Sequence, residues 1–149
     1  MQLTELISPD DIVMGTRSAS IGLAAAEVLR ATLPHRGFTP ADIERFAGEV
    51  LEREHEAPTL CGAIAIPHAR DPQLQSFVAA IGINPAGIIE GPGSPRVMIV
   101  FLSPEAKRSE HLALLASLAR LGRDTSAVSS LASAGSAEDV IRLLHAPKS

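Results

Sequence analysis

The sequence predicts an α/β fold, in which helices cover both faces of a mixed β-sheet within one domain over residues 1–149. Helical apolar periodicity occurs before and after a central region of continuous apolar runs, which are typical of buried strands. No repeat or linker interrupts the chain. The 149 residues, 46% of them hydrophobic and 20% charged, are enough for one core, so a sheet with helices packed on it is expected.

Composition argues against two classes of function. A formal net charge of -4, with four Phe and no Trp or Tyr, offers neither the basic surface nor the stacking rings of a nucleic-acid-binding protein. The longest apolar runs, Ile21–Ala26 and Val97–Leu102, are far shorter than the roughly 20 residues of a membrane span, so no membrane insertion is expected. The single cysteine, Cys61, cannot form a disulfide within the chain, which favours a cytoplasmic location.

The first predicted helix covers residues 18–33. Its apolar residues recur at i, i+3, i+4, i+7 and i+8, which is one face of a helix; they are Ile21, Ala24, Ala25, Val28 and Leu29. The break Pro34–Gly37 ends this helix.

A second helix is expected directly afterwards. Thr39 offers an N-cap hydroxyl, Pro40 suits the first helical position, and Asp42 places a carboxylate in the first turn. The residues predicted to face the core are Ile43, Phe46, Ala47, Val50 and Leu51. The pattern ends near Arg53.

Three strands are predicted in the centre of the chain. Ala63–Ile66 is a short apolar run that stops at Pro67, which cannot donate to a ladder, so His68 is expected just past a strand end. Two longer runs suit strands buried on both faces, Phe77–Ile83 and Val97–Leu102. Between these two, the three Pro and three Gly of Asn84–Arg96 predict a loop.

Two more helices are predicted towards the C-terminus. The apolar residues that mark the first of them are Leu112, Leu115, Ala116 and Ala119. Ser136–Asp139 resembles a capping box and begins the last helix, whose apolar residues are Val140, Ile141, Leu143 and Leu144.

His68 is the main candidate for chemistry. It follows a proline at the mouth of the predicted sheet and is flanked by alanines that leave room for a partner, so an exposed ring nitrogen is expected there. An imidazole in that position is a competent nucleophile and a good leaving group near neutral pH, which suits reversible transfer of a phosphoryl group. A hydrogen-bonded structural histidine is the alternative interpretation, and spacing alone does not separate the two.

The run Ala63-Ile64-Ala65-Ile66-Pro67-His68-Ala69 matches the core of a motif that reads roughly G-x-A-[IV]-P-H-[AG]. The whole chain resembles the type-2 IIA domains of the sugar phosphotransferase system (PTS), the fructose and mannitol group that includes the nitrogen-regulatory IIA proteins. The resemblance implies a mannitol-type EIIA fold. It also implies that the Nε2 atom of His68 accepts a phosphoryl group from the phosphocarrier HPr, or its nitrogen-branch counterpart NPr, and passes it to a IIB component in sugar uptake.

Three further positions match the family pattern: Arg53, Thr59 and His111. The resemblance implies that His68, His111 and Arg53 are catalytic and that Arg53, Thr59 and His111 bind phosphate. A guanidinium suits two phosphoryl oxygens, and an imidazole at a helix start can donate an N–H to a third. The structural alternatives are a helix-end arginine, a packed histidine and a loop-capping threonine. Arg70 is interpreted as a solvent-facing charge, with phosphate binding and steering of an acidic partner as its alternatives.

A regulatory protein is the alternative function. In it, the phosphorylation state of His68 controls docking to target proteins without sugar transport, because added negative charge changes which partners bind. Neither a cofactor nor a metal is expected. His55, His68 and His111 include no close H-x-x-x-H pair, and Gly91-Pro92-Gly93 lacks the third glycine of a dinucleotide-binding motif.

Two segments depart from the family pattern. The stretch between Arg53 and His68 is one residue shorter, with Leu60-Cys61-Gly62-Ala63-Ile64 in place of a glycine-rich run, so different loop geometry is expected near the site. The turn Glu90–Arg96 is also unusual, which we expect to affect partner specificity more than the transfer chemistry.

Overall fold

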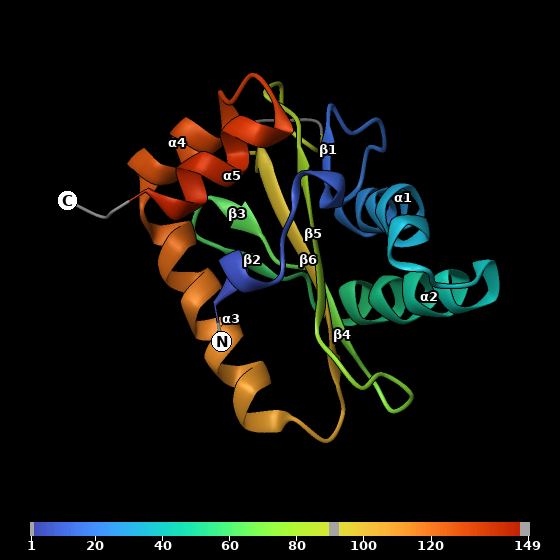
Figure 1. Cartoon of the computed structure of the whole chain (residues 1–149). Helices are drawn as coiled ribbons and strands as arrows, with labels where there is room; N and C mark the ends of the chain where they lie inside the picture. The colour runs from blue at the N-terminus through green and yellow to red at the C-terminus, as the bar shows by residue number, and fades with distance from the viewer. Residues whose placement is uncertain (1, 90–92, 147–149) are drawn as a thin grey trace.

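A mixed β-sheet runs through the centre of the protein (Figure 1). The computed structural model describes residues 2–89 and 93–146. Within them the strands are β1 (Ile12–Met14), β2 (Leu60–Cys61), β3 (Ile64–Ala65), β4 (His68–Asp71), β5 (Val78–Ile83) and β6 (Val97–Pro104). Their order is β1-β5-β6-β3-β2, and β4 also pairs with β6. Because β6 is antiparallel to β5 and parallel to β3 and β4, the predicted mixed sheet is confirmed.

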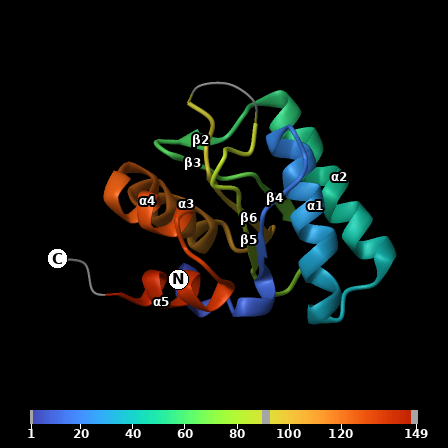
Figure 2. The ribbon, with the colours of Figure 1, turned by 90° about the horizontal axis from the view of Figure 1, so that it is seen from above.

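Helices cover both faces of this sheet, as predicted (Figure 2). One face carries α1 (Ile21–Thr32) and α2 (Pro40–Glu56). The other carries α3 (Arg108–Arg123), α4 (Thr125–Ala132) and α5 (Ala137–His145). Short 3₁₀ turns lie at Leu3–Glu5, Pro9–Asp11 and Leu33–Arg36. No helix of the described ranges has the length and apolar character needed to cross a membrane.

The continuous apolar runs of β5 and β6 are explained by burial on both faces. In β6, Val97, Ile99 and Phe101 belong to the core under α3–α5, whereas Met98, Val100 and Leu102 belong to the core under α1 and α2. Every residue of both strands is buried. A strand between two helical layers has no polar face, so its sequence does not alternate.

The predicted helix starts are confirmed by their caps. The hydroxyl of Thr39 accepts a hydrogen bond from the Asp42 N–H at 3.1 Å, and that of Ser136 accepts one from the Asp139 N–H at 3.1 Å. At its other end α2 continues about one turn past Arg53, to Glu56. Arg53 therefore lies in the last helical turn.

Several short elements were not predicted: β1, β2, β4 and α4. Helix α4 spans 8 residues and is rich in serine, so its apolar pattern is too short to stand out. His68 does follow the end of β3, as expected, but it is also the first residue of a further strand, β4, which was not expected. β3 and β4 pair successively with the same strand, at Val97–Met98 and Phe101–Pro104 of β6, and Pro67 interrupts the ladder only locally.

The loop predicted over Asn84–Arg96 is confirmed for its described part, since no helix or strand is present at residues 84–89 and 93–96. The Asn84 N–H donates to the Arg96 carbonyl at 2.9 Å and closes the base of the loop. Residues 90–92, on which part of the unusual turn falls, lie outside the described residues.

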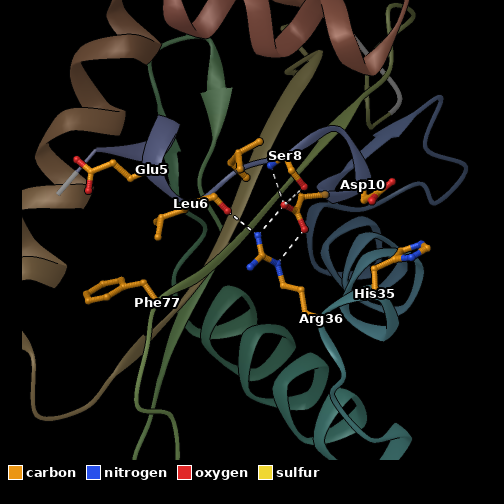
Figure 3. A pocket seen from close by; sticks show the side chains of 9 residues that line it. Glu5, Leu6, Ser8, Asp10, His35, Arg36 and Phe77 are labelled. Carbon is orange, nitrogen blue, oxygen red and sulfur yellow. Dashed lines mark hydrogen bonds and ion pairs between the residues drawn. The ribbon is translucent and has the colours of Figure 1, made fainter.

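An ion pair fastens the N-terminal segment to the α1–α2 connection, beside a pocket of about 640 Å³ (Figure 3). Arg36 donates to both carboxylate oxygens of Asp11, at 2.8 and 2.6 Å, and to the Leu6 carbonyl at 2.6 Å. Asp11 also accepts from the Ser8 N–H at 2.9 Å. These bonds satisfy a carboxylate that is buried in the fold.

Helix α3 meets the β2–β3 turn through two glycines. A Cβ at Gly122 would lie 2.0 Å from the Cys61 carbonyl oxygen, and one at Gly62, whose φ is +60°, would lie 2.3 Å from the Gly122 carbonyl oxygen. The Ala63 N–H donates to that Gly122 carbonyl at 2.9 Å. The close approach of the two backbones leaves no room for side chains at these positions.

We expect Gly122→Ala to lower the free energy of unfolding by about 2 kcal/mol or more, because a methyl group there must displace backbone atoms. Gly48→Ala is the matched control, because Gly48 is an exposed residue inside α2 and no atom lies near the position of an added Cβ. The free energy of unfolding of this variant should rise by about 0.5–1 kcal/mol. Urea unfolding measures both variants. Equal effects of the two substitutions would contradict the close contact.

Candidate functional site

Three aromatic rings gather where β4, β6 and α3 meet. His68 opens β4, its register partner Phe101 lies on β6, and His111 lies near the start of α3. The His68 ring stacks on Phe101 at 4.9 Å between centroids and 5° between planes. The His111 ring lies 5.4 Å from that of His68 and 5.3 Å from that of Phe101. The fold thus brings together two histidines that are 43 positions apart in the sequence.

The hydrogen bond of His68 determines which of its ring nitrogens carries the lone pair. Nδ1 lies 2.7 Å from the Ile66 carbonyl oxygen. A carbonyl only accepts, so Nδ1 carries the hydrogen and the lone pair of the neutral ring is on Nε2. Nε2 is buried and has no hydrogen-bond partner among the described residues.

The ring of His68 is less accessible than the sequence suggested. The residue is 3% exposed, so the expected exposed ring nitrogen was wrong. The neighbouring Ala69 belongs to the core on the other face of the sheet, and on the His68 face the rings of Phe101 and His111 lie against the imidazole. A reacting group reaches Nε2 only when the side chains that cover it move.

A chain of hydrogen bonds holds the backbone that orients His68. The Ile66 N–H donates to the Thr59 carbonyl at 2.8 Å. Thr59 in turn donates through its N–H and its hydroxyl to the two carboxylate oxygens of Glu54, each at 3.0 Å. Since both donors of Thr59 are used by Glu54, Thr59 positions the loop and has no free donor for a phosphate.

His111 is fixed by a buried serine. Its Nδ1 lies 2.5 Å from Oγ of Ser103, a fully buried residue of β6. His111 itself is 5% exposed. This contact leaves the other ring nitrogen, Nε2, for a different partner.

Two arginines supply positive charge to this site. Arg53 is exposed in the last turn of α2, and it makes no ion pair with any residue in the described ranges. Arg70, two residues after His68, donates through Nη2 to the Glu105 carbonyl. Both line a hollow of about 270 Å³, here called the β4-edge hollow, with Glu49, Glu52, Glu56 and Ala69.

These surroundings keep both histidines neutral at pH 7. Burial lowers the pKa of His68, and the charge of Arg53 lowers it further, against the opposing effects of the Ile66 carbonyl and of Glu54. Burial lowers the pKa of His111 to about 4, with added contributions from His68, Arg70 and Arg53. A neutral His68 keeps its Nε2 lone pair available for attack.

The end of β4 is anchored to α2 by charged groups. Asp71 is fully buried and accepts from Arg45 Nε at 3.1 Å and from the Gln73 N–H at 2.7 Å. Glu49 lies beside it. Burial, together with the hydrogen bond and charge of Asp71, raises the pKa of Glu49 to about 7. These contacts fix the helix that carries Arg53 against the strand that carries His68.

A family comparison identifies the chain. Residues 27–146 match the model described as "Phosphoenolpyruvate-dependent sugar phosphotransferase system, EIIA 2". The chain belongs to this EIIA family. Family members are phosphotransferase components, and the match includes the segments that contain Arg53, His68 and His111. Among the described residues no group of three or more metal-ligating side chains is present.

Relatives of this EIIA protein come from both branches of the family. It is 28% identical to a nitrogen regulatory protein of Bradyrhizobium diazoefficiens over 99% of this chain and 97% of that one. It is 29% identical to the mannitol-specific phosphotransferase enzyme IIA component of Bacillus subtilis, over 81% and 84%. The crystal structure of IIA-Ntr from Neisseria meningitidis superposes with a TM-score of 0.76 at 26% identity, covering 95% of this chain and 98% of that one.

Sequence reasoning missed three residues that shape this EIIA site: Glu54, Phe101 and Ser103. Phe101 and Ser103 lie within or just after an apolar run, where nothing distinguishes them from core residues. Glu54 follows Arg53 and has the ordinary appearance of a helix-end carboxylate. Only the register of β4 on β6, which pairs His68 with Phe101 and Arg70 with Ser103, places Phe101 and Ser103 at the site, and only the hydrogen bonds to Thr59 connect Glu54 with it.

The lowered pKa of His111 predicts a loss of stability in acid. Between its ordinary value of 6.5 and about 4, the unfolded chain binds a proton that the folded chain does not, so stability falls as the pH falls through that window. At pH 5 the loss amounts to about 2 kcal/mol. Urea unfolding at pH 5 and at pH 8 measures this loss, as the change with pH in the difference in free energy of unfolding between the wild type and His111→Asn.

The comparison with this variant is needed because Glu49 acts in the opposite direction. A raised carboxyl pKa stabilises the folded chain at low pH and loses that effect as the pH rises through about 7. Glu49 is present in both proteins, so its effect cancels in the difference. An equal wild-type advantage at both pH values would contradict the prediction.

Proposed function

We propose that this EIIA protein is a cytoplasmic phosphohistidine carrier of the phosphoenolpyruvate-dependent phosphotransferase system, with residues 1–149 as one EIIA type-2 domain. It accepts a phosphoryl group from HPr, or from NPr, on Nε2 of His68 and passes it to a IIB component. The observation that carries the proposal is the arrangement of His68, whose Nδ1–H is bonded to the Ile66 carbonyl while Nε2 is unpartnered among the described residues. Family membership supports the reaction class.

The transfer is a displacement at phosphorus. The Nε2 lone pair of His68 forms the N–P bond while the bond from phosphorus to the donor atom of the carrier breaks, and the electron pair leaves with the carrier. The hydrogen stays on Nδ1 and remains hydrogen-bonded to the Ile66 carbonyl oxygen, which stabilises the positive charge that develops on the ring. In the second half-reaction a nucleophile of the acceptor forms a bond to phosphorus while the same N–P bond breaks, and the electron pair of that bond returns to Nε2.

Arg53 and His111 stabilise the transferring group in this proposal. The exposed guanidinium of Arg53 approaches two phosphoryl oxygens with its planar fork. Ser103 Oγ lies 2.5 Å from His111 Nδ1, and in this proposal the hydroxyl donates to that nitrogen, so that the hydrogen of the neutral His111 ring is on Nε2 and donates to a third oxygen. Catalysis of this kind consists of positioning and charge stabilisation.

The acceptor is a IIB component in the transport branch. A protein of the same fold, the mannitol enzyme IIA of Escherichia coli, has been solved in complex with phosphorylated enzyme IIB, with a TM-score of 0.72 and 21% identity to this chain. The nitrogen-regulatory relatives raise the alternative in which phosphorylated His68 controls docking to a regulatory target. Both alternatives share the charging step on His68.

The charging step is tested with phosphoenolpyruvate, enzyme I and either HPr or NPr. We expect a gain in mass of one acid-labile phosphoryl group, and we expect His68→Ala to abolish it. His55→Ala is the control, because His55 is exposed in the last turn of α2 and should leave the gain intact. No mass gain with either carrier would refute the function, and subsequent addition of IIB identifies the acceptor.

The role of Ser103 is tested separately. We expect Ser103→Ala to lower the charging rate by roughly tenfold, because the hydrogen of His111 is then free to move between the two ring nitrogens. Nitrogen-15 shifts of the His111 ring should report that change of tautomer. Ser130→Ala, an exposed serine of α4, is the control. An unchanged rate and unchanged ring shifts in Ser103→Ala would show that Ser103 only packs.

A further inference from the structure

Arg70 lies on the same face of the sheet as His68. Residues i and i+2 of a strand point to the same side, and the register partners Phe101 and Ser103 continue this face on β6. Ser103 contacts His111. Arg70 is therefore directed towards the layer of α3 and the His68–His111 pair, and not simply into solvent as its sequence context suggested.

The guanidinium of Arg70 is only partly satisfied. Nη2 donates to the Glu105 carbonyl, whereas Nε is buried and has no partner within the described part of the chain. An unpartnered buried donor is costly, so its presence needs an explanation. His68 Nε2 is an unpartnered buried nitrogen on the same short strand.

The two arginines approach the edge of β4 from opposite sides of the sheet. Arg53 comes from α2, which packs on one face, and Arg70 belongs to the face under α3, yet both line the β4-edge hollow. The positive charge of each lowers the pKa of His111. Both cations therefore act on His111, whose ring centroid lies 5.4 Å from that of His68.

We propose that Arg70 binds the phosphoryl group carried by His68, donating its Nε–H to an oxygen while Nη2 stays on the Glu105 carbonyl. This inference rests on the proposed function and adds a second guanidinium to it. The bond to Glu105 holds the guanidinium in place before the phosphoryl group arrives, which lowers the entropy cost of binding. Arg53, which is exposed, approaches the same group from the solvent side.

The test compares Arg70→Met with Arg70→Lys, and with Arg120→Met as control, since Arg120 is an exposed arginine of α3. Each protein is charged in two ways, by the carrier system and by phosphoramidate, which phosphorylates histidine without any carrier. The charging rate is measured by mass. Phosphorus-31 NMR follows the titration of the phosphoryl group on His68, and thermal unfolding reports the stability of each variant.

We expect Arg70→Met to lower the charging rate at least tenfold and to raise the titration midpoint of the phosphoryl group by about one pH unit, because a neighbouring cation favours the dianion. Arg70→Lys should keep the midpoint and recover only part of the rate, since an ammonium lacks the planar fork. Arg120→Met should match the wild type in both measurements.

The outcomes separate the two proposals. If the wild type is charged by phosphoramidate but by neither carrier, the carrier function fails and the phosphorus titration still tests Arg70. If Arg70→Met leaves the midpoint unchanged, Arg70 does not bind the phosphoryl group, even when the rate or the stability falls. If His68 takes a phosphoryl group from neither source, both proposals are wrong.

Discussion

The hydrogen bond from the Nδ1–H of His68 to the Ile66 carbonyl is the contact on which the rest of the site depends. It fixes the tautomer of the ring and thereby places the lone pair on Nε2. The position of this carbonyl is fixed by two further contacts. The N–H of the same residue, Ile66, donates to the Thr59 carbonyl, and Thr59 is hydrogen-bonded to Glu54. A helix-end carboxylate thus determines, through two backbone segments, which nitrogen of an imidazole is free to react.

Most of the fold followed from apolar periodicity, because long elements bury enough residues to leave a pattern. Helices α1 and α2 and strands β5 and β6 were predicted close to their observed bounds. Strand β3 was predicted as part of Ala63–Ile66, but β2 and β4 were beyond that approach, since neither exceeds four residues and the pairing of β4 depends on β6, which is distant in the sequence. Pro67 indicates a strand end correctly, but no local signal shows that the ladder resumes at His68.

The candidate site was predicted less completely than the fold. Sequence motifs indicated His68, Arg53 and His111, and the structure brings the two histidines into one ring cluster within the charge of Arg53. The burial of His68 was not predicted, because the rings that cover it come from other elements: Phe101 from β6 and His111 from α3. Thr59 has the chemistry of a phosphate ligand, yet a nearby carboxylate uses its donors. Such competition between partners is visible only in three dimensions.

The placement of β4 has a further consequence for how the molecules behave in a crowded solution. Among the described strands β4 pairs with β6 alone, so its second edge has no strand partner, and such an edge is the part of a sheet at which another extended chain can add. One of its four residues, Arg70, carries a charge that is only half-buried, and charge on an edge strand discourages strand addition between molecules. The strand that carries His68 therefore also carries a charge that works against pairing of this edge with another molecule.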